Sequence, residues 1–100
     1  MELSKSDKDG TYTISVTGEI DLYSSPDLRS AITKAIPAAA SALRIDLSAV
    51  EYMDSSGVAT LVEGLRACME RSVAFVLHKP SQPVLKVLQL SRLDTVFTIK

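Results

Sequence analysis

The stretch MDSSGV, residues 53–58, connects two segments whose apolar patterns differ. Before it, Leu43, Ile45 and Leu47 alternate with polar residues, which is the period-two pattern of a strand with one face in solvent. After it, residues 56–70 carry apolar side chains at the spacing of an amphipathic helix. A strand followed at once by a helix places the connecting loop at the carboxyl edge of a sheet, where α/β proteins commonly bind ligands.

The residues of this corner fit three uses. The first turn of a helix has unpaired backbone N–H groups, which together with the helix dipole favour an anion such as phosphate. In the first use the phosphate belongs to a bound nucleotide or phosphoester. In the second it is attached covalently to Ser55 or Ser56. The third use is structural, because Asp54 and the serines form a good helix N-cap and Gly57 can ease the turn.

The first part of the chain predicts a β-hairpin. Residues 11–17 alternate apolar and hydroxyl side chains, and the preceding pair Asp9-Gly10 is typical of a type I′ turn. Residues 2–7 are therefore expected to form the other arm. The pattern of an apolar residue at every second position continues past the end of this arm as far as Leu22.

A helix is expected next, between two prolines. Ser24 or Ser25 can cap its amino end, and Pro26 suits the first helical position because its backbone lacks the N–H that would be unpaired there. Pro37 should end the helix or disturb it, since proline disrupts a helix interior.

The last third of the chain predicts two strands around a short helix. The continuous apolar run VAFVL, residues 73–77, is typical of a strand covered on both faces, and we expect it to be central in the sheet. A helix should start near Pro83, and residues 97–99 read as a last strand. The resulting order, β-β-α-β-α-β-α-β, describes an α/β fold in a single domain over residues 1–100.

Composition excludes several classes of function. The net charge is −1 with acidic and basic residues intermixed, so we expect no nucleic-acid partner. No window approaches the roughly 18 apolar residues of a membrane span, and the amino end lacks an apolar signal segment, so we expect a cytoplasmic protein without membrane insertion. One cysteine, Cys68, and one histidine cannot form a disulfide or a standard zinc site, so no metal is expected.

Two segments resemble the signature regions of the STAS domain family, the fold of sulfate transporters and anti-sigma-factor antagonists. They are GEIDLYSS at residues 18–25 and DLSAVEYMDSSGVATL at residues 46–61, and the likeness extends to SRLDTVF before the last strand. The resemblance covers the whole chain. It implies a mixed sheet of four to five strands packed by three to four helices.

The resemblance also implies a function. Free-standing members of the family are cytoplasmic antagonists that bind an anti-sigma factor, itself a serine kinase, and thereby release a sigma factor; phosphorylation breaks the complex and a serine phosphatase restores it. The matching phosphoacceptor, directly before the glycine, is Ser56. The matching partner-binding residues are Asp21, Asp54, Ser55, Ser56 and Gly57. The resemblance implies no catalytic residue and no cofactor.

Two other functions remain open at this point. Within the family, the domain can be an accessory subunit of an ABC-type membrane transporter complex, with the same face docked on an ATPase. In a different class, Ser55 or Ser56 with His78 and an aspartate could form a small serine hydrolase. The nucleophile-elbow pattern for such an enzyme needs a glycine two residues before the serine, where Met53 stands before Ser55, so the hydrolase is disfavoured.

Overall fold

Alternating apolar residues form a five-stranded mixed sheet in the computed structural model, which describes residues 1–100. The strands lie in the order β1-β2-β3-β4-β5, and the elements follow one another as β-β-α-β-α-β-α-β. The strands are β1 (Glu2–Lys8), β2 (Thr11–Ile20), β3 (Ala42–Met53), β4 (Ala74–His78) and β5 (Thr98–Ile99). The helices are α1 (Ser25–Ala35), with a short 3₁₀ turn η1 (Ile36–Ala38), α2 (Ser55–Glu70) and α3 (Gln82–Leu90).

The predicted hairpin is confirmed. β1 and β2 pair antiparallel, whereas every other neighbouring pair of strands is parallel. The two residues between them have positive φ angles, 52° at Asp9 and 84° at Gly10, as a type I′ turn requires. The Gly10 carbonyl also accepts hydrogen bonds from the N–H groups of Ser41 and Ala42, so the turn is tied to the start of β3.

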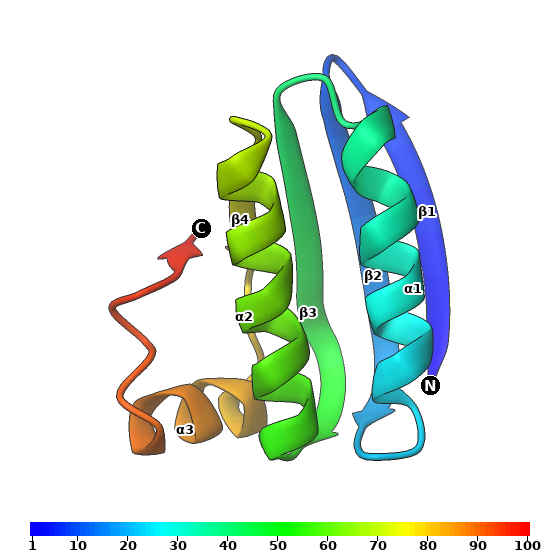
Figure 1. Cartoon of the computed structure of the whole chain (residues 1–100). Helices are drawn as coiled ribbons and strands as arrows, with labels where there is room; N and C mark the ends of the chain where they lie inside the picture. Colours follow the sequence, from blue (N-terminus) through cyan, green and yellow to red (C-terminus); the bar gives the residue numbers. More distant parts are fainter.

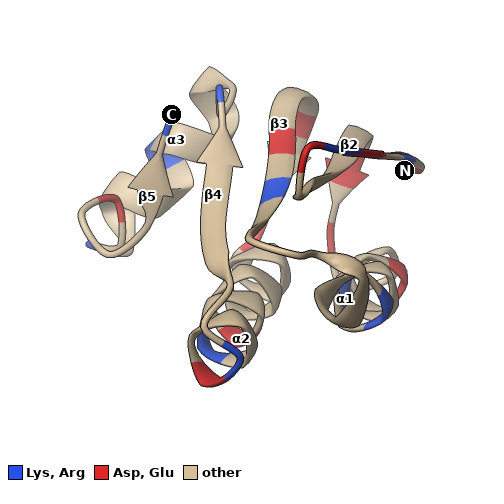
Figure 2. Cartoon of the chain, turned by 90° about the horizontal axis from the view of Figure 1, so that it is seen from above, with Lys and Arg blue, Asp and Glu red and all other residues tan.

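Two helices cover one face of the sheet. Figures 1 and 2 show α1 and α2 side by side on that face, with their amino ends at the same end of the molecule. Leu28 and Leu61 are fully buried beneath them, within a core of 22 buried residues. On the surface, Arg29 of α1 donates to Glu63 of α2 at 2.7 Å. None of the helices is long and apolar enough to cross a bilayer.

Close contact between α2 and the sheet depends on small residues. A Cβ atom added at Gly64 would lie 3.0 Å from the Phe75 ring and 3.3 Å from Ile32. Cys68, one turn further along α2, is fully buried. Burial raises the pKa of its thiol, because the charged thiolate is poorly solvated there.

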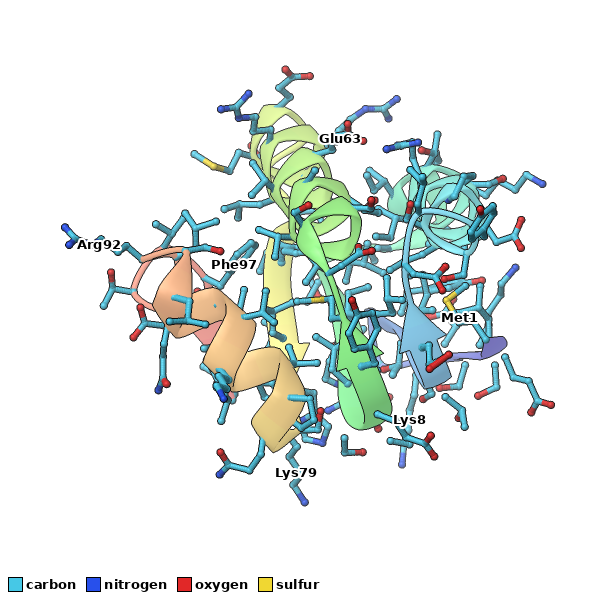
Figure 3. The ribbon with its side chains drawn as sticks, turned by 90° about the horizontal axis from the view of Figure 1, so that it is seen from below. Met1, Lys8, Glu63, Lys79, Arg92 and Phe97 are labelled. Carbon is cyan, nitrogen blue, oxygen red and sulfur yellow. The ribbon has the colours of Figure 1, made fainter.

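The prediction that residues 73–77 form the central strand is wrong. Residues 74–77 lie in β4, an interior strand between β3 and β5, but β3 is the middle strand of the sheet. β4 is covered fully on one face only: Phe75 and Leu77 are buried, whereas on the other face Ala74 is exposed and Val76 is half-buried. The neighbouring β5 is only two residues long, and Phe97 just before it packs beside β4 against Phe75 with ring centroids 6.3 Å apart (Figure 3).

The remaining boundaries agree with the sequence. Pro37 lies in η1, directly after α1, so it ends the helix as expected. α3 has Pro83 in its first turn and packs against β3 through Val84 and Leu88. The Ser81 hydroxyl donates to the Val50 carbonyl at 2.6 Å, which fixes the amino end of α3 beside the second half of β3.

Replacing Gly10 with alanine should destabilise the fold. A Cβ atom at φ 84° is strained, and it would also lie 2.9 Å from the Ser41 hydroxyl. We expect Gly10→Ala to lower the free energy of unfolding by about 1–2 kcal/mol, the cost of a left-handed residue with a side chain. Asp9→Asn is the matched control, because asparagine tolerates positive φ, and urea denaturation compares the two. Equal losses in both variants would contradict the assigned turn.

Candidate functional site

The start of α2 with its cap (residues 54–57, the serine corner) lies beside the loop after β2 (residues 21–24, the acidic loop), and one backbone hydrogen bond ties the two together. The N–H of Asp54, just past the end of β3, donates to the carbonyl of Ile20, the last residue of β2, at 3.1 Å. Because β2 and β3 are parallel, the loops that follow them leave the sheet at the same end, the lower end in Figure 1. Residues 21–24 and residues 54–57 are therefore neighbours, although some 30 positions separate them in the chain.

Asp54 is the N-cap of α2. Its Oδ1 accepts the N–H of Ser56 at 2.9 Å, and its backbone carbonyl accepts the N–H groups of Gly57 and Val58 at 3.1 and 3.3 Å. The structural use of this residue is thus confirmed. The expectation that the first N–H groups of the helix lie open to an external anion is wrong for Ser56 and Gly57, because Asp54 already pairs them; the Val58 bond is the first regular bond of the helix.

The two serines are the accessible part of the corner. Ser55 is exposed and Ser56 is half-buried. Ser56 is held through its backbone: its N–H donates to Asp54, and its carbonyl accepts the Thr60 hydroxyl at 2.9 Å. These bonds leave the Ser56 hydroxyl uncommitted, so a modified or substituted side chain at this position need not break the helix.

Gly57 serves close packing and not a turn. It is buried within the first turn of α2, and its φ angle is not positive. A Cβ atom at this position would collide with Cγ of Met53 and lie 2.9 Å from Cγ2 of Ile20. The suggested role in easing the turn is therefore wrong. The glycine lets the amino end of α2 rest directly on the ends of β2 and β3.

Asp21 organises the acidic loop. Its Oδ1 accepts the N–H groups of Tyr23 and Ser24, at 3.0 and 2.9 Å, and the Ser24 hydroxyl at 3.1 Å. The hydrogen bond from the Ser24 N–H, followed by those from the Ser24 hydroxyl and the Tyr23 N–H, holds the pKa of Asp21 below its usual 3.8. Asp21 is only partly exposed, and one of its oxygens is occupied by its own loop.

Ser24 occupies the predicted cap position of α1 but does not cap it with its side chain. Its hydroxyl instead accepts the N–H of Asp21 at 2.9 Å and shares its single proton between the carbonyl of Glu19, at 2.9 Å, and Oδ1 of Asp21, at 3.1 Å. The expected cap position is confirmed, although Pro26 takes the second helical position and not the first, and the Ser24 side chain closes the preceding loop. α1 begins at Ser25, one residue before Pro26.

Three exposed apolar residues at this edge were not identified as site residues from the sequence. Leu22 and Tyr23 lie in the loop after β2, and Tyr52 lies near the end of β3. The alternation of apolar residues up to Leu22 is typical of a strand that continues. β2 nevertheless ends at Ile20, and the Leu22 side chain is 67% exposed. Exposure after a strand end depends on the turn of the chain, which no periodicity reveals.

His78 does not approach the serines. It pairs in register with Asp46, and Met53 lies seven residues further along β3, a strand length of roughly 20 Å. No Ser–His–Asp arrangement forms at this corner. The one hollow in the surface lies between α1 and α2, has a volume of about 160 Å³, and is lined by residues such as Ile32, Thr60 and Gly64. Neither Ser55 nor Ser56 lines it.

The fold and this corner define an α/β domain with a serine-bearing helix start beside an acidic loop. The chain belongs to the STAS domain family: the family model described as Mlab, STAS domain, matches residues 3–99. An anti-sigma-B factor antagonist from Listeria monocytogenes is 31% identical over 100 residues, covering 100% of this chain and 87% of that protein.

Solved structures show the same fold. An anti-sigma factor antagonist from Mycobacterium paratuberculosis superposes with a TM-score of 0.87 at 31% identity, covering 98% of this chain and 83% of that one. Unphosphorylated SpoIIAA gives a TM-score of 0.82 at 26% identity, over 99% of this chain and 88% of that one. SpoIIAA from Bacillus in its phosphorylated form gives 0.75 at 25% identity, over 99% and 91%.

Loss of the Asp54 side chain should loosen α2. Asp54→Ala leaves the Ser56 N–H without its partner, and we expect a loss of about 0.5–2 kcal/mol in the free energy of unfolding. Asp54→Asn keeps an oxygen acceptor and should lose much less. Chemical denaturation of both variants measures the difference. If alanine and asparagine are equally stable, the side chain does not cap the helix.

Stability should decline in acid partly through Asp21. Because the pKa of this carboxyl is lower in the folded protein than in the unfolded chain, its contribution is fully present above pH 3.8 and is lost as the pH falls through the folded value. The stability difference between wild type and Asp21→Asn should therefore shrink between about pH 5 and pH 2. Thermal unfolding across this range measures it. A difference that is constant with pH would contradict the assigned hydrogen bonds.

Proposed function

We propose that this protein is a cytoplasmic anti-sigma-factor antagonist that works by partner switching, as a binding module and not an enzyme. Residues 1–100 act as one STAS domain. The unphosphorylated form binds an anti-sigma factor that is also a serine kinase, and the bound anti-sigma factor releases its sigma factor. Phosphorylation of Ser56 breaks this complex, and a serine phosphatase restores the binding form.

The observation that carries the proposal is the setting of Ser56. It lies in the first turn of α2, half-buried, with a hydroxyl that its hydrogen-bonded backbone leaves uncommitted. A hydroxyl held at the start of a helix, at the protein surface, can be reached by a kinase and can be contacted by a docked partner. The names of the relatives support the same role, since they are anti-sigma-factor antagonists and SpoIIAA exists in a phosphorylated form.

The geometry explains why a phosphate would act as a switch. A phosphoserine carries about −1.5 to −2 charges at neutral pH. At position 56 this charge would arrive beside the Asp54 carboxylate, which already occupies the Ser56 N–H. The helix end is thus partly neutralised before modification and offers little compensation to a second anion. A partner that covers the corner must then desolvate an excess negative charge, which costs several kcal/mol when it is unpaired.

A covalent phosphate fits the corner better than a bound phosphoester. Small-molecule sites are typically hollows of about 300–1,000 Å³. Ser55 is exposed and Ser56 half-buried, and neither lines the hollow of about 160 Å³ between α1 and α2. An attached phosphoryl group needs no enclosing pocket.

Substitutions at Ser56 should separate the two states. Anti-sigma factors from the same genome, each verified by its binding of a sigma factor, are titrated calorimetrically with the purified domain. We expect Ser56→Ala to bind one of them as wild type does, and Ser56→Asp to bind it at least tenfold more weakly, a loss of about 1.4 kcal/mol. Ser55→Asp is the matched control, placing the same charge one residue away.

The outcomes are distinguishable. If no anti-sigma factor binds wild type, the proposed partner is wrong. If Ser56→Ala and Ser56→Asp bind equally well, the proposed switch is wrong although the partner stands. Phosphopeptide mapping of the fragment from Ile45 to Arg66, from cells in different growth conditions, then reports whether Ser56 is modified. A Ser56 that is never occupied favours a permanently docked subunit, as in a transporter complex.

A further inference from the structure

Two consecutive apolar side chains project into solvent next to the serine corner. Tyr23 is 89% exposed and Leu22 is 67% exposed, so most of their apolar surface contacts water. Tyrosine in such a position is typical of protein interfaces, where it supplies a large contact area and a few residues of this kind carry most of the binding energy.

The loop that carries these side chains is held in place. Asp21 accepts the N–H groups of Tyr23 and Ser24, and the Ser24 hydroxyl ties the loop back to Glu19 at the end of β2. The carbonyl of Asp21 also accepts the N–H of Ser25 at 2.8 Å, where α1 begins. A partner that binds Leu22 and Tyr23 therefore orders little backbone, and this lowers the entropic cost of binding.

The loop and Ser56 belong to one surface. Ile20, two residues before Leu22, accepts the N–H of Asp54, and its side chain lies directly beside Gly57. Figure 1 shows the β2–α1 loop and the amino end of α2 together at the lower end of the molecule. Of the other exposed large apolar side chains, Met69 lies at the opposite end of α2, about 20 Å from Ser55 by helix rise.

We propose that Leu22 and Tyr23 are the apolar anchor of the anti-sigma-factor complex, and that Asp21 acts on binding by positioning them. This inference rests on the proposed function. The occupant is the anti-sigma factor, which should present an apolar pocket for Tyr23 with basic groups around it. The basic groups would pair with the exposed carboxylates of Glu19, near the end of β2, and Asp27, in the first turn of α1, which flank the loop that carries Leu22 and Tyr23.

Asp21 is thereby assigned a different role from that of a direct contact. Its Oδ1 accepts hydrogen bonds from Tyr23 and Ser24 of its own loop, so the carboxylate is held against the loop and only Oδ2 is left for a partner cation. An anchor beside Ser56 also explains how one phosphate can disrupt the complex. The apolar contact can form only if the adjacent corner is desolvated, and the phosphate opposes that step.

The anchor is tested by alanine substitution with a matched control. Tyr23→Ala and Met69→Ala each remove a highly exposed apolar side chain, one at the proposed interface and one far from it. Both should unfold at the denaturant midpoint of wild type, because neither residue is buried. In calorimetric titration with the anti-sigma factor that binds wild type, we expect Tyr23→Ala to bind at least tenfold more weakly and Met69→Ala to bind as wild type does.

The positioning role of Asp21 is tested by a double-mutant cycle. If Asp21 acts through the loop, Asp21→Ala should weaken binding in the wild-type background but add little once Tyr23 is alanine. Asp21→Asn should bind nearly as wild type does, because its carbonyl oxygen can accept the same N–H groups without a charge. A direct ionic contact predicts the opposite: additive losses, and no rescue by asparagine.

The results also separate this inference from the proposed function. If wild type binds the anti-sigma factor and Ser56→Asp does not, but Tyr23→Ala binds as tightly as wild type, the anchor is wrong and the switch stands. Equal losses for Tyr23→Ala and Met69→Ala would likewise overturn the anchor. If wild type binds no anti-sigma factor, the proposed function fails and the anchor fails with it.

Discussion

The parallel pairing of β2 with β3, closed by the hydrogen bond from the Asp54 N–H to the Ile20 carbonyl, is the contact on which the site depends. Two loops that are distant in the chain leave the sheet at one point because these strands run in the same direction. Gly57 strengthens the arrangement by letting α2 rest on the strand ends without a side chain between them. Sheet, helix start and acidic loop therefore form a single rigid unit.

The carboxylates of Asp21 and Asp54 both accept hydrogen bonds from neighbouring groups of their own chain. Asp54 pairs with the backbone of α2, and Asp21 pairs with the backbone and hydroxyl of its own loop. The groups nearest to Ser56 that are left for a partner are serine hydroxyls and the side chains of Leu22 and Tyr23, which are uncharged; the exposed carboxylates of Glu19 and Asp27 flank the loop that carries Leu22 and Tyr23. A surface of this kind can be desolvated at modest cost, and a single added phosphate changes that cost sharply.

The same arrangement separates stability from regulation. The buried core lies beneath α1 and α2, whereas the Ser56 hydroxyl and the Tyr23 ring lie at the rim. A charge added at the rim changes what can bind without altering core packing. Stability resides instead in that core, in the Asp54 cap, in the close contacts that Gly57 and Gly64 of α2 allow, and in the left-handed residues of the hairpin turn.

The spacing of apolar residues and the residue types at turns were enough to predict most elements, because these elements depend on neighbouring residues. Examples are the type I′ hairpin, the helix between Ser25 and Pro37, and the strand-to-helix corner. The resemblance of two short segments indicated the family, and Asp54 was recognised as a cap. The central position of β3, the packing role of Gly57 and the exposure of Leu22 were decided by tertiary structure. Strand order, close approach and the direction of a loop arise from contacts between distant segments, and no local pattern encodes those contacts.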